Sequence, residues 1–113
     1  FGPHTPHLSW SVGKSVTAAL AGVLAGRGLL AVDRPVPLRE WQQPGDPRAR
    51  ITAGDLLRMS GGLDMTQAQP GDAVYYTSRH HHEWVYAGAV DVFAYALARQ
   101  AAFAPNTVWR YRN

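Results

Sequence analysis

The sequence predicts a mostly α-helical chain with long loops. Three segments place apolar residues at helical spacing, and no run of alternating apolar and polar residues predicts a β-strand. Prolines and glycines interrupt the stretches between these segments. The length of 113 residues allows one domain. With 46% hydrophobic and only 17% charged residues, the composition excludes a solvated disordered tail and a coiled coil.

The first predicted helix is the most apolar part of the chain. We expect Ser9 to cap its start, and Gly26 and Gly28 to end it. One face carries apolar residues at helical spacing, namely Val12, Val16, Ala19, Leu20, Val23 and Leu24. The other face carries Ala18, Ala21, Gly22 and Ala25. Because both faces are apolar or small, we expect this helix to be buried on most sides.

A loop and a second helix follow. Residues 29–50 contain four prolines and are typical of a meandering loop. We expect the second helix to start with Thr52 as its N-cap, because Asp55 stands at the capping-box spacing, and to end at Gly61-Gly62. Its apolar side is predicted to consist of Leu56, Leu57 and Met59.

The last part of the chain predicts one further helix. Residues 63–82 look irregular, and a helix is predicted from Asp91 to near Gln100. The residues expected to face a core are Val92, Phe93, Ala96 and Leu97. Pro105-Asn106 then turns the chain. Three helices and long loops, with the most apolar helix near the start, are typical of one part of a larger fold.

Charge and cysteine content exclude several kinds of partner. The net charge is +3, and ten of the eleven basic residues are Arg, scattered along the chain. A nucleic-acid binder usually shows a basic stripe, so we expect no nucleic-acid partner. The longest uncharged apolar stretch, residues 15–26, is shorter than the about 20 residues that cross a bilayer, so we expect no membrane segment. Without cysteine, the chain has no disulfide and no thiolate nucleophile.

The ends of the chain predict a piece of a longer protein. No initiator Met and no signal peptide stand at the start, and the sequence stops at Tyr111-Arg112-Asn113. The sequence does not indicate the compartment or the oligomeric state.

One pair of residues has the spacing of an activated nucleophile. Ser11 stands three residues before Lys14, the only lysine, and residues three apart share one face of a helix. A serine needs a base to take its proton, and a lysine can be that base when burial lowers its pKa. The helix N-terminus also favours an oxyanion near the Ser11 amide. The alternative is a capping serine beside a lysine that extends to solvent.

A second candidate lies at the end of the chain. Tyr111 and Asn113 form a Tyr-x-Asn triplet after the turn at Pro105. A phenol can pass a proton between a serine and a leaving group, and an amide can hold a substrate carbonyl or the lysine. The alternative is a surface tyrosine and a chain-end asparagine.

Together these segments resemble the β-lactamase-like, penicillin-recognising serine hydrolases. The resemblance is to the branch of class C β-lactamases, DD-peptidases, β-lactamase-like esterases and 6-aminohexanoate-oligomer hydrolases. Four ordered segments carry it: the Ser-x-x-Lys motif within residues 9–17, residues 28–36, residues 51–63, and residues 91–113 with the Tyr-x-Asn motif. The resemblance implies an α+β family fold, with a helical cluster and an antiparallel sheet. This chain would hold mostly the α-helical part.

The resemblance implies a role for each motif residue. Ser11 would be the acylated nucleophile, Lys14 its base, Tyr111 a second acid/base, and Asn113 a hydrogen-bond partner of the substrate or of Lys14. The Ser11 amide would be one oxyanion donor. The implied reaction is acyl transfer through an acyl-enzyme followed by hydrolysis, on an ester, amide or β-lactam-like small molecule, with no cofactor and no metal.

The sequence departs from the family pattern in three places. Met59-Ser60-Gly61-Gly62 stands where relatives often carry His-Thr-Ser-Gly, which predicts a different loop packing. Arg112 replaces a small residue within the Tyr-x-Asn motif, and its bulk either narrows the pocket or points outwards. The Lys-Thr-Gly or His-x-Gly strand of relatives is absent from residues 1–113. The piece alone is therefore expected to lack part of the oxyanion hole.

Aromatic residues and histidines give weaker signals. We expect the four tryptophans, Trp10, Trp41, Trp84 and Trp109, to be core or pocket-wall residues rather than part of a cofactor site. Trp10 and Trp109 flank the two motifs, so either could line a substrate pocket. We expect His80-His81-His82 to be a surface loop rather than a metal site, since three adjacent histidines cannot all face one metal on a regular element.

Four functions stay open from the sequence. The leading hypothesis is a β-lactamase-related serine hydrolase that acts on an ester or amide. A penicillin-binding DD-peptidase is the second, and a related domain that binds or senses a ligand without turnover is the third. The fourth is an unrelated small helical domain, in which Lys14 would be exposed and far from Tyr111.

Overall fold

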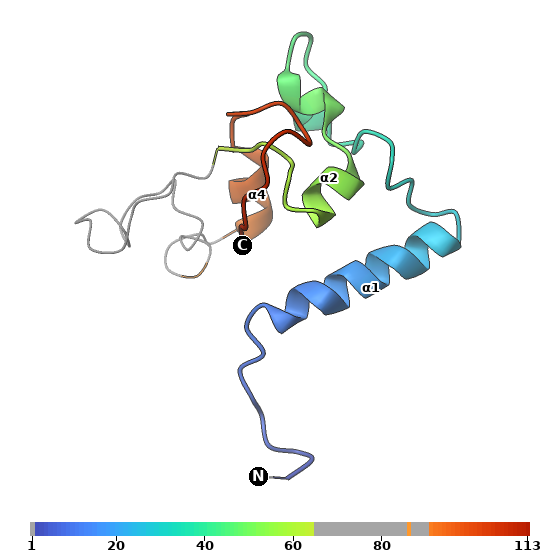
Figure 1. The fold of residues 1–113 in the computed structure, drawn as a ribbon, viewed down its shortest axis with the longest axis vertical. Helices are drawn as coiled ribbons and strands as arrows, with labels where there is room; N and C mark the ends of the chain where they lie inside the picture. Colours follow the sequence, from blue (N-terminus) through green and yellow to red (C-terminus); the bar gives the residue numbers. More distant parts are fainter. Residues whose placement is uncertain (1, 65–85, 87–90) are drawn as a thin grey trace, which may run out of the picture. The chain divides into compact units, whose positions relative to one another are not determined.

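The computed structural model describes residues 2–64, 86 and 91–113, and these residues form helices and loops (Figure 1). No β-strand occurs within the described ranges, which contain only two isolated bridges, Pro35 with Thr52 and Leu63 with Ala101. The expected helical character of the chain is therefore confirmed for this part. Two compact units are present, Phe1–Ala31 and Val32–Asn113, here called the N-terminal and C-terminal units.

The N-terminal unit contains one helix, α1, which covers Val12–Gly26. Its N-cap is Ser11, so the expectation that Ser9 caps the helix is wrong. The carbonyl of Ser9 accepts the Val12 N–H at 3.0 Å, which places Ser9 before the first turn. The Ser11 side chain makes no capping hydrogen bond to the backbone. Its Oγ instead accepts a hydrogen bond from Lys14 Nζ.

The end of α1 follows the prediction. Gly28 adopts a φ of 71°, a left-handed conformation that glycine adopts without a steric cost. Its N–H donates to the carbonyl of Ala25 at 2.9 Å, and the Leu29 N–H donates to the carbonyl of Leu24 at 2.9 Å. These two bonds form a Schellman motif, which satisfies carbonyl groups that the helix itself leaves without partners.

The apolar surface of α1 is exposed, contrary to the expectation of a buried helix. None of its residues is buried, and Val12 and Leu20 are 66% and 61% exposed. The prediction was wrong because α1 is the only helix in its unit, so the unit provides no second layer against which both faces could pack.

In the C-terminal unit, the predicted loop contains two short 3-10 helices. The first, η1, covers Arg39–Trp41, and the second, η2, covers Pro47–Arg50. Asp46 is the N-cap of η2 and accepts the Arg48 N–H at 2.8 Å, while Pro47 occupies the first helical position, where no N–H is needed. The residues between these turns lack regular structure, as expected for a proline-rich segment.

The helix α2 covers Ala53–Leu57 and begins as predicted. Thr52 Oγ1 accepts the Asp55 N–H at 3.0 Å, and Asp55 Oδ2 accepts the Thr52 N–H at 3.0 Å, which completes a capping box. The helix ends earlier than the glycine pair, because Met59 adopts a φ of 59° that a right-handed helix cannot continue. Leu57 is 42% exposed, so the expected apolar side of α2 is not a core face.

The helix α4 covers Val92–Leu97 and begins one residue after Asp91, where the helix was expected to start. Asp91 is its N-cap, and its side chain accepts the Ala94 N–H at 2.9 Å. The helix ends three residues before Gln100. Phe93 is 62% exposed, which contradicts its expected place in a core.

A buried tryptophan and an arginine hold the end of α4. Trp41 is 2% exposed, and its Nε1 donates to the carbonyl of Leu97 at 2.9 Å. Arg48 Nη1 donates to the same carbonyl at 3.0 Å and to the carbonyl of Arg99 at 2.8 Å. Because side chains from the 3-10 helices satisfy these carbonyls, the backbone does not need another helical turn to do so. Trp41 and Ile51 are the buried hydrophobic residues of the described core.

Candidate active site

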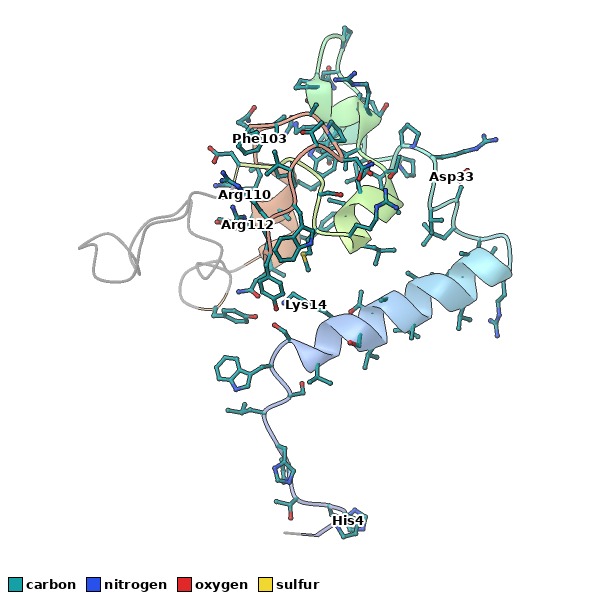
Figure 2. All side chains as sticks on the ribbon, viewed as in Figure 1. His4, Lys14, Asp33, Phe103, Arg110 and Arg112 are labelled. Carbon is teal, nitrogen blue, oxygen red and sulfur yellow. The ribbon has the colours of Figure 1, made fainter. Side chains whose placement is uncertain are left out.

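The first turn of α1 joins the two residues of the Ser-x-x-Lys motif. Lys14 Nζ donates a hydrogen bond of 3.0 Å to Ser11 Oγ, and both residues are half-buried. Figure 2 labels Lys14 in the first turn of α1. The helical spacing predicts this proximity, and the structure contains it. A hydroxyl held against an amine at this distance is within reach of direct proton transfer.

The residue before Ser11 has an unusual backbone conformation. Trp10 adopts a φ of 45°, in the left-handed region that non-glycine residues rarely enter. Such a conformation costs about 1–3 kcal/mol and persists only where the surrounding structure imposes it. The carbonyl of Trp10 accepts the Gly13 N–H at 3.2 Å, so the strained residue also forms part of the first turn that carries Ser11. Sequence analysis gave no sign of this strain.

The Tyr-x-Asn motif lies at the end of the C-terminal unit. Tyr111 is 40% exposed, and Asn113 is half-buried. Arg112, between them, is half-buried and does not simply point outwards. Its Nη1 donates to the Tyr111 carbonyl at 2.9 Å, and its Nε is buried without a hydrogen-bond partner among the described residues.

Burial is the main cause of a lowered pKa for Arg112. The positive charge of Arg110 lowers this pKa further, and the carboxylate of Asp64 opposes the effect. Arg110 itself lies over the ring of Phe103, with its guanidinium carbon 4.7 Å from the ring centre (Figure 2). Two arginines, Arg110 and Arg112, therefore lie within or next to the Tyr-x-Asn motif, and among the described residues Asp64 is the one carboxylate that acts on Arg112.

The segment before the motif is held by the loop that follows α2. The Arg110 N–H donates to the carbonyl of Met59 at 2.9 Å, and the Asn106 N–H donates to the carbonyl of Ser60 at 2.7 Å. The carbonyl of Gly62 accepts the N–H groups of both Ala102 and Phe103. Residues 59–62, where the sequence departs from the family pattern, thus hold the chain that leads to Tyr111 and Asn113.

Ser60 and Asn106 are joined by a contact that the sequence does not predict. Ser60 is 6% exposed, and its Oγ lies 3.3 Å from Asn106 Oδ1. One signal was available, because Pro105-Asn106 predicts a turn and asparagine tolerates a left-handed conformation. The partner, 46 positions away, could not be inferred from spacing.

The tryptophans that flank the motifs have exposed side chains. Trp10 is 74% exposed and Trp109 is 68% exposed, and their role in lining a substrate pocket stays a prediction. Trp41, by contrast, is a core residue. Trp84 lies outside the described residues.

Within residues 2–64, 86 and 91–113, no group of three His, Cys, Asp or Glu side chains is placed to hold a metal ion. His80-His81-His82 lies outside these ranges. In the same part of the chain, no helix has the length and apolar character needed to cross a bilayer.

A comparison with known families identifies the same family that the motifs resemble. The sequence model of the Beta-lactamase family matches residues 1–113, the whole chain. The chain therefore belongs to the Beta-lactamase family, and this membership implies the serine hydrolase superfamily. A search of curated proteins found no match.

Proposed function

We propose that this chain carries the nucleophile of a serine hydrolase that cleaves an ester or amide through an acyl-enzyme on Ser11. The observation that supports it most directly is the 3.0 Å contact between Lys14 Nζ and Ser11 Oγ in the first turn of α1. Membership of the Beta-lactamase family supports the same reaction class. The proposed substrate is a small molecule with an ester, amide or β-lactam-like bond, and the reaction needs no cofactor.

In the proposed acylation step, Lys14 accepts the proton of the Ser11 hydroxyl while Oγ attacks the substrate carbonyl carbon. The carbonyl oxygen becomes an oxyanion as the new C–O bond forms. Because Ser11 is the N-cap of α1, its backbone N–H lies at the positive end of the helix and is the proposed oxyanion donor. The negative charge that develops is then stabilised by a group already fixed by the backbone.

The Tyr-x-Asn residues have the second set of proposed roles. Tyr111 delivers a proton to the leaving alcohol or amine as the bond to it breaks. Asn113 donates its amide to the substrate carbonyl or holds Lys14. The proton that Lys14 took replaces the one that Tyr111 gave up, so both groups return to their starting state. Water then attacks the carbonyl carbon of the ester on Ser11 while one of these two groups takes the proton that water loses. The C–Oγ bond breaks as that proton is passed to the departing Oγ. The roles of Tyr111 and Asn113 are inferred from the resemblance of Tyr111-Arg112-Asn113 to the Tyr-x-Asn motif of the family.

Two alternative functions within the family would use the same residues and differ in what happens to the acyl-enzyme. A penicillin-binding DD-peptidase would form the same acyl-enzyme on a peptide amide. A binding or sensor domain would form it and release it very slowly, or would bind without reaction. The rate of deacylation therefore separates these functions.

The test uses the complete protein that contains these residues. It is incubated with a chromogenic short-chain ester and, separately, with a chromogenic cephalosporin, and adducts are located by mass spectrometry. We expect an acyl adduct on Ser11 that Ser11→Ala abolishes. Ser15→Ala is the matched control, because Ser15 is an exposed serine on the same helix. Turnover identifies a hydrolase, a long-lived adduct identifies a sensor, and the absence of any Ser11 adduct would refute the proposal.

A further inference from the structure

Two segments of the C-terminal unit are joined around Ser60 and Asn106. The Asn106 N–H donates to the Ser60 carbonyl at 2.7 Å, and Ser60 Oγ bonds with Asn106 Oδ1 at 3.3 Å. The Arg110 N–H adds a third bond, to the carbonyl of Met59 at 2.9 Å. We call these three hydrogen bonds the Ser60–Asn106 clasp. It ties residues 59–60 to residues 106–110, immediately before Tyr111.

A residue on each side of the clasp has a left-handed backbone conformation. Met59 has a φ of 59° and Asn106 has a φ of 61°. Asparagine accepts this conformation readily, whereas methionine does so at a cost of about 1–3 kcal/mol. A strained methionine next to a bonded serine indicates that the surrounding contacts determine the backbone here. The clasp is therefore a fixed feature of the unit rather than an incidental surface contact.

Ser60 is not a second nucleophile. It is 6% exposed, and its Oγ lies within hydrogen-bond distance of the Asp55 carbonyl, at 3.2 Å, as well as of Asn106 Oδ1. A buried hydroxyl between two acceptors is already bonded and inaccessible to a substrate. Its contacts point to a role in holding the chain.

We propose that Ser60 and Asn106 are positioning residues for Tyr111 in acylation. The inference rests on the proposed function, in which the Tyr111 phenol delivers a proton to the leaving group. The clasp fixes the backbone up to Arg110, one residue before Tyr111. It therefore determines the position of the backbone from which the Tyr111 side chain extends. A displacement of about 1 Å in a reacting group can reduce a rate about 100-fold, so this fixation matters for chemistry as well as for stability.

The decisive variants change the side chain of residue 106. Asn106→Gly keeps the left-handed backbone accessible but removes the Oδ1 acceptor. Asn106→Asp keeps an acceptor oxygen at the same place and is the conservative rescue. Thr107→Ala is the matched control, because Thr107 Oγ1 bonds with the Ala104 carbonyl at 2.7 Å on the same turn without contributing to the clasp.

The measurement is the pre-steady-state acylation rate constant of the complete protein at saturating chromogenic ester. We expect Asn106→Gly to reduce it at least about tenfold, and we expect Asn106→Asp and Thr107→Ala to stay within about threefold of wild type. Thermal unfolding of each variant, measured in parallel, shows that the rates refer to folded protein. If Asn106→Gly does not fold, Ser60→Ala replaces it, since it removes the same side-chain bond from the other partner, together with the Ser60 Oγ contact to the Asp55 carbonyl.

A double-mutant cycle separates positioning from a general structural effect. In a Tyr111→Phe background, Asn106→Gly should reduce acylation less than about threefold, because the group it positions is already gone. Equal reductions in both backgrounds would overturn the clasp proposal. So would a Tyr111→Phe defect accompanied by a wild-type rate for Asn106→Gly. A wild-type rate for Tyr111→Phe alone would instead refute the proposed role of Tyr111, which is a separate result.

Discussion

Lys14 Nζ and Ser11 Oγ lie 3.0 Å apart, one helical turn from each other at the start of α1. Ser11 is the N-cap of α1 but makes no side-chain capping bond, and its hydroxyl accepts the hydrogen bond from Lys14 instead. A helix N-terminus without its usual side-chain cap costs about 1 kcal/mol. The arrangement thus gives up local stability and keeps the hydroxyl next to an amine.

The base role of Lys14 predicts the effect of Lys14→Arg. Arginine keeps a long basic side chain at this position, but a guanidinium stays protonated and cannot accept the Ser11 proton. We expect acylation of Ser11 to fall at least about 100-fold, the range typical of a lost general base. Adduct formation, followed by mass spectrometry over time, measures it. Thr17→Ala, an exposed position on the same helix, is the control, and acylation retained in Lys14→Arg would exclude the role.

The loop after α2 predicts a steric effect at Gly62. Its φ is 77°, and an added Cβ would collide with the backbone carbonyl of Phe103. Gly45 has a φ of 83° but open space around an added Cβ, so Gly45→Ala tests the backbone conformation alone. We expect Gly62→Ala to lower the free energy of unfolding by about 1–3 kcal/mol more than Gly45→Ala does. Urea unfolding measures both, and equal losses would show that the Phe103 carbonyl moves aside without cost.

The capping box of α2 predicts a pH-dependent stability. Burial raises the pKa of Asp55, but hydrogen bonds from Thr52 and the charge of Arg58 outweigh it and hold the pKa below its usual 3.8. A carboxyl group with a lowered pKa in the folded state stabilises the fold above its unfolded pKa, and this contribution is lost as the pH falls through the folded value. The stabilisation should therefore be complete above about pH 5 and decline below 3.8.

Asp55→Asn tests this expectation, since the amide does not titrate. The difference in free energy of unfolding between wild type and variant should be largest at neutral pH and shrink below about pH 4. Denaturant unfolding at a series of pH values measures it. Asp46→Asn removes a second carboxyl, whose pKa is lowered mainly by its hydrogen bond with Arg48. A difference for Asp55→Asn that stays constant from neutral pH to pH 3 would contradict the assignment.

The contact between Trp41 and α4 predicts different costs for two tryptophan substitutions. Trp41→Phe keeps an aromatic ring in the core but leaves the Leu97 carbonyl with one donor fewer, so we expect a loss of about 1–3 kcal/mol in the free energy of unfolding. Trp109→Phe, at a side chain that is 68% exposed, should stay within about 0.5 kcal/mol of wild type. Thermal or urea unfolding distinguishes them, and similar small losses would show that the Trp41 hydrogen bond contributes little.

Features that depend on neighbours within a few residues were predictable from the sequence. The capping box of Thr52 and Asp55 and the glycine end of α1 are present as expected, and α4 begins within one residue of the predicted Asp91. The Ser11–Lys14 contact belongs to the same class, because helical geometry fixes which residues three positions apart meet. The motifs, as short ordered patterns, also predicted the family that the comparison shows.

Several of the incorrect predictions concern which helix faces are buried, and not whether the helices form. Periodicity correctly showed that α1 has apolar faces, but it could not show that those faces are exposed in the N-terminal unit. The same reasoning placed Phe93 of α4 in a core from which the structure excludes it. Periodicity records which residues share a face, and burial depends on what lies opposite that face.

By itself the sequence determined the start of α2, the glycine end of α1, the nucleophile–base spacing and the family, because each rests on residues close together in the chain or on short motifs. Only the tertiary structure decided where α4 ends and what holds the segment before Tyr111. The Trp41–Leu97 bond joins residues 56 positions apart, and the Ser60–Asn106 bond joins residues 46 apart. Such partners are chosen by how the whole unit folds, since each buried polar group must find a partner wherever packing places it.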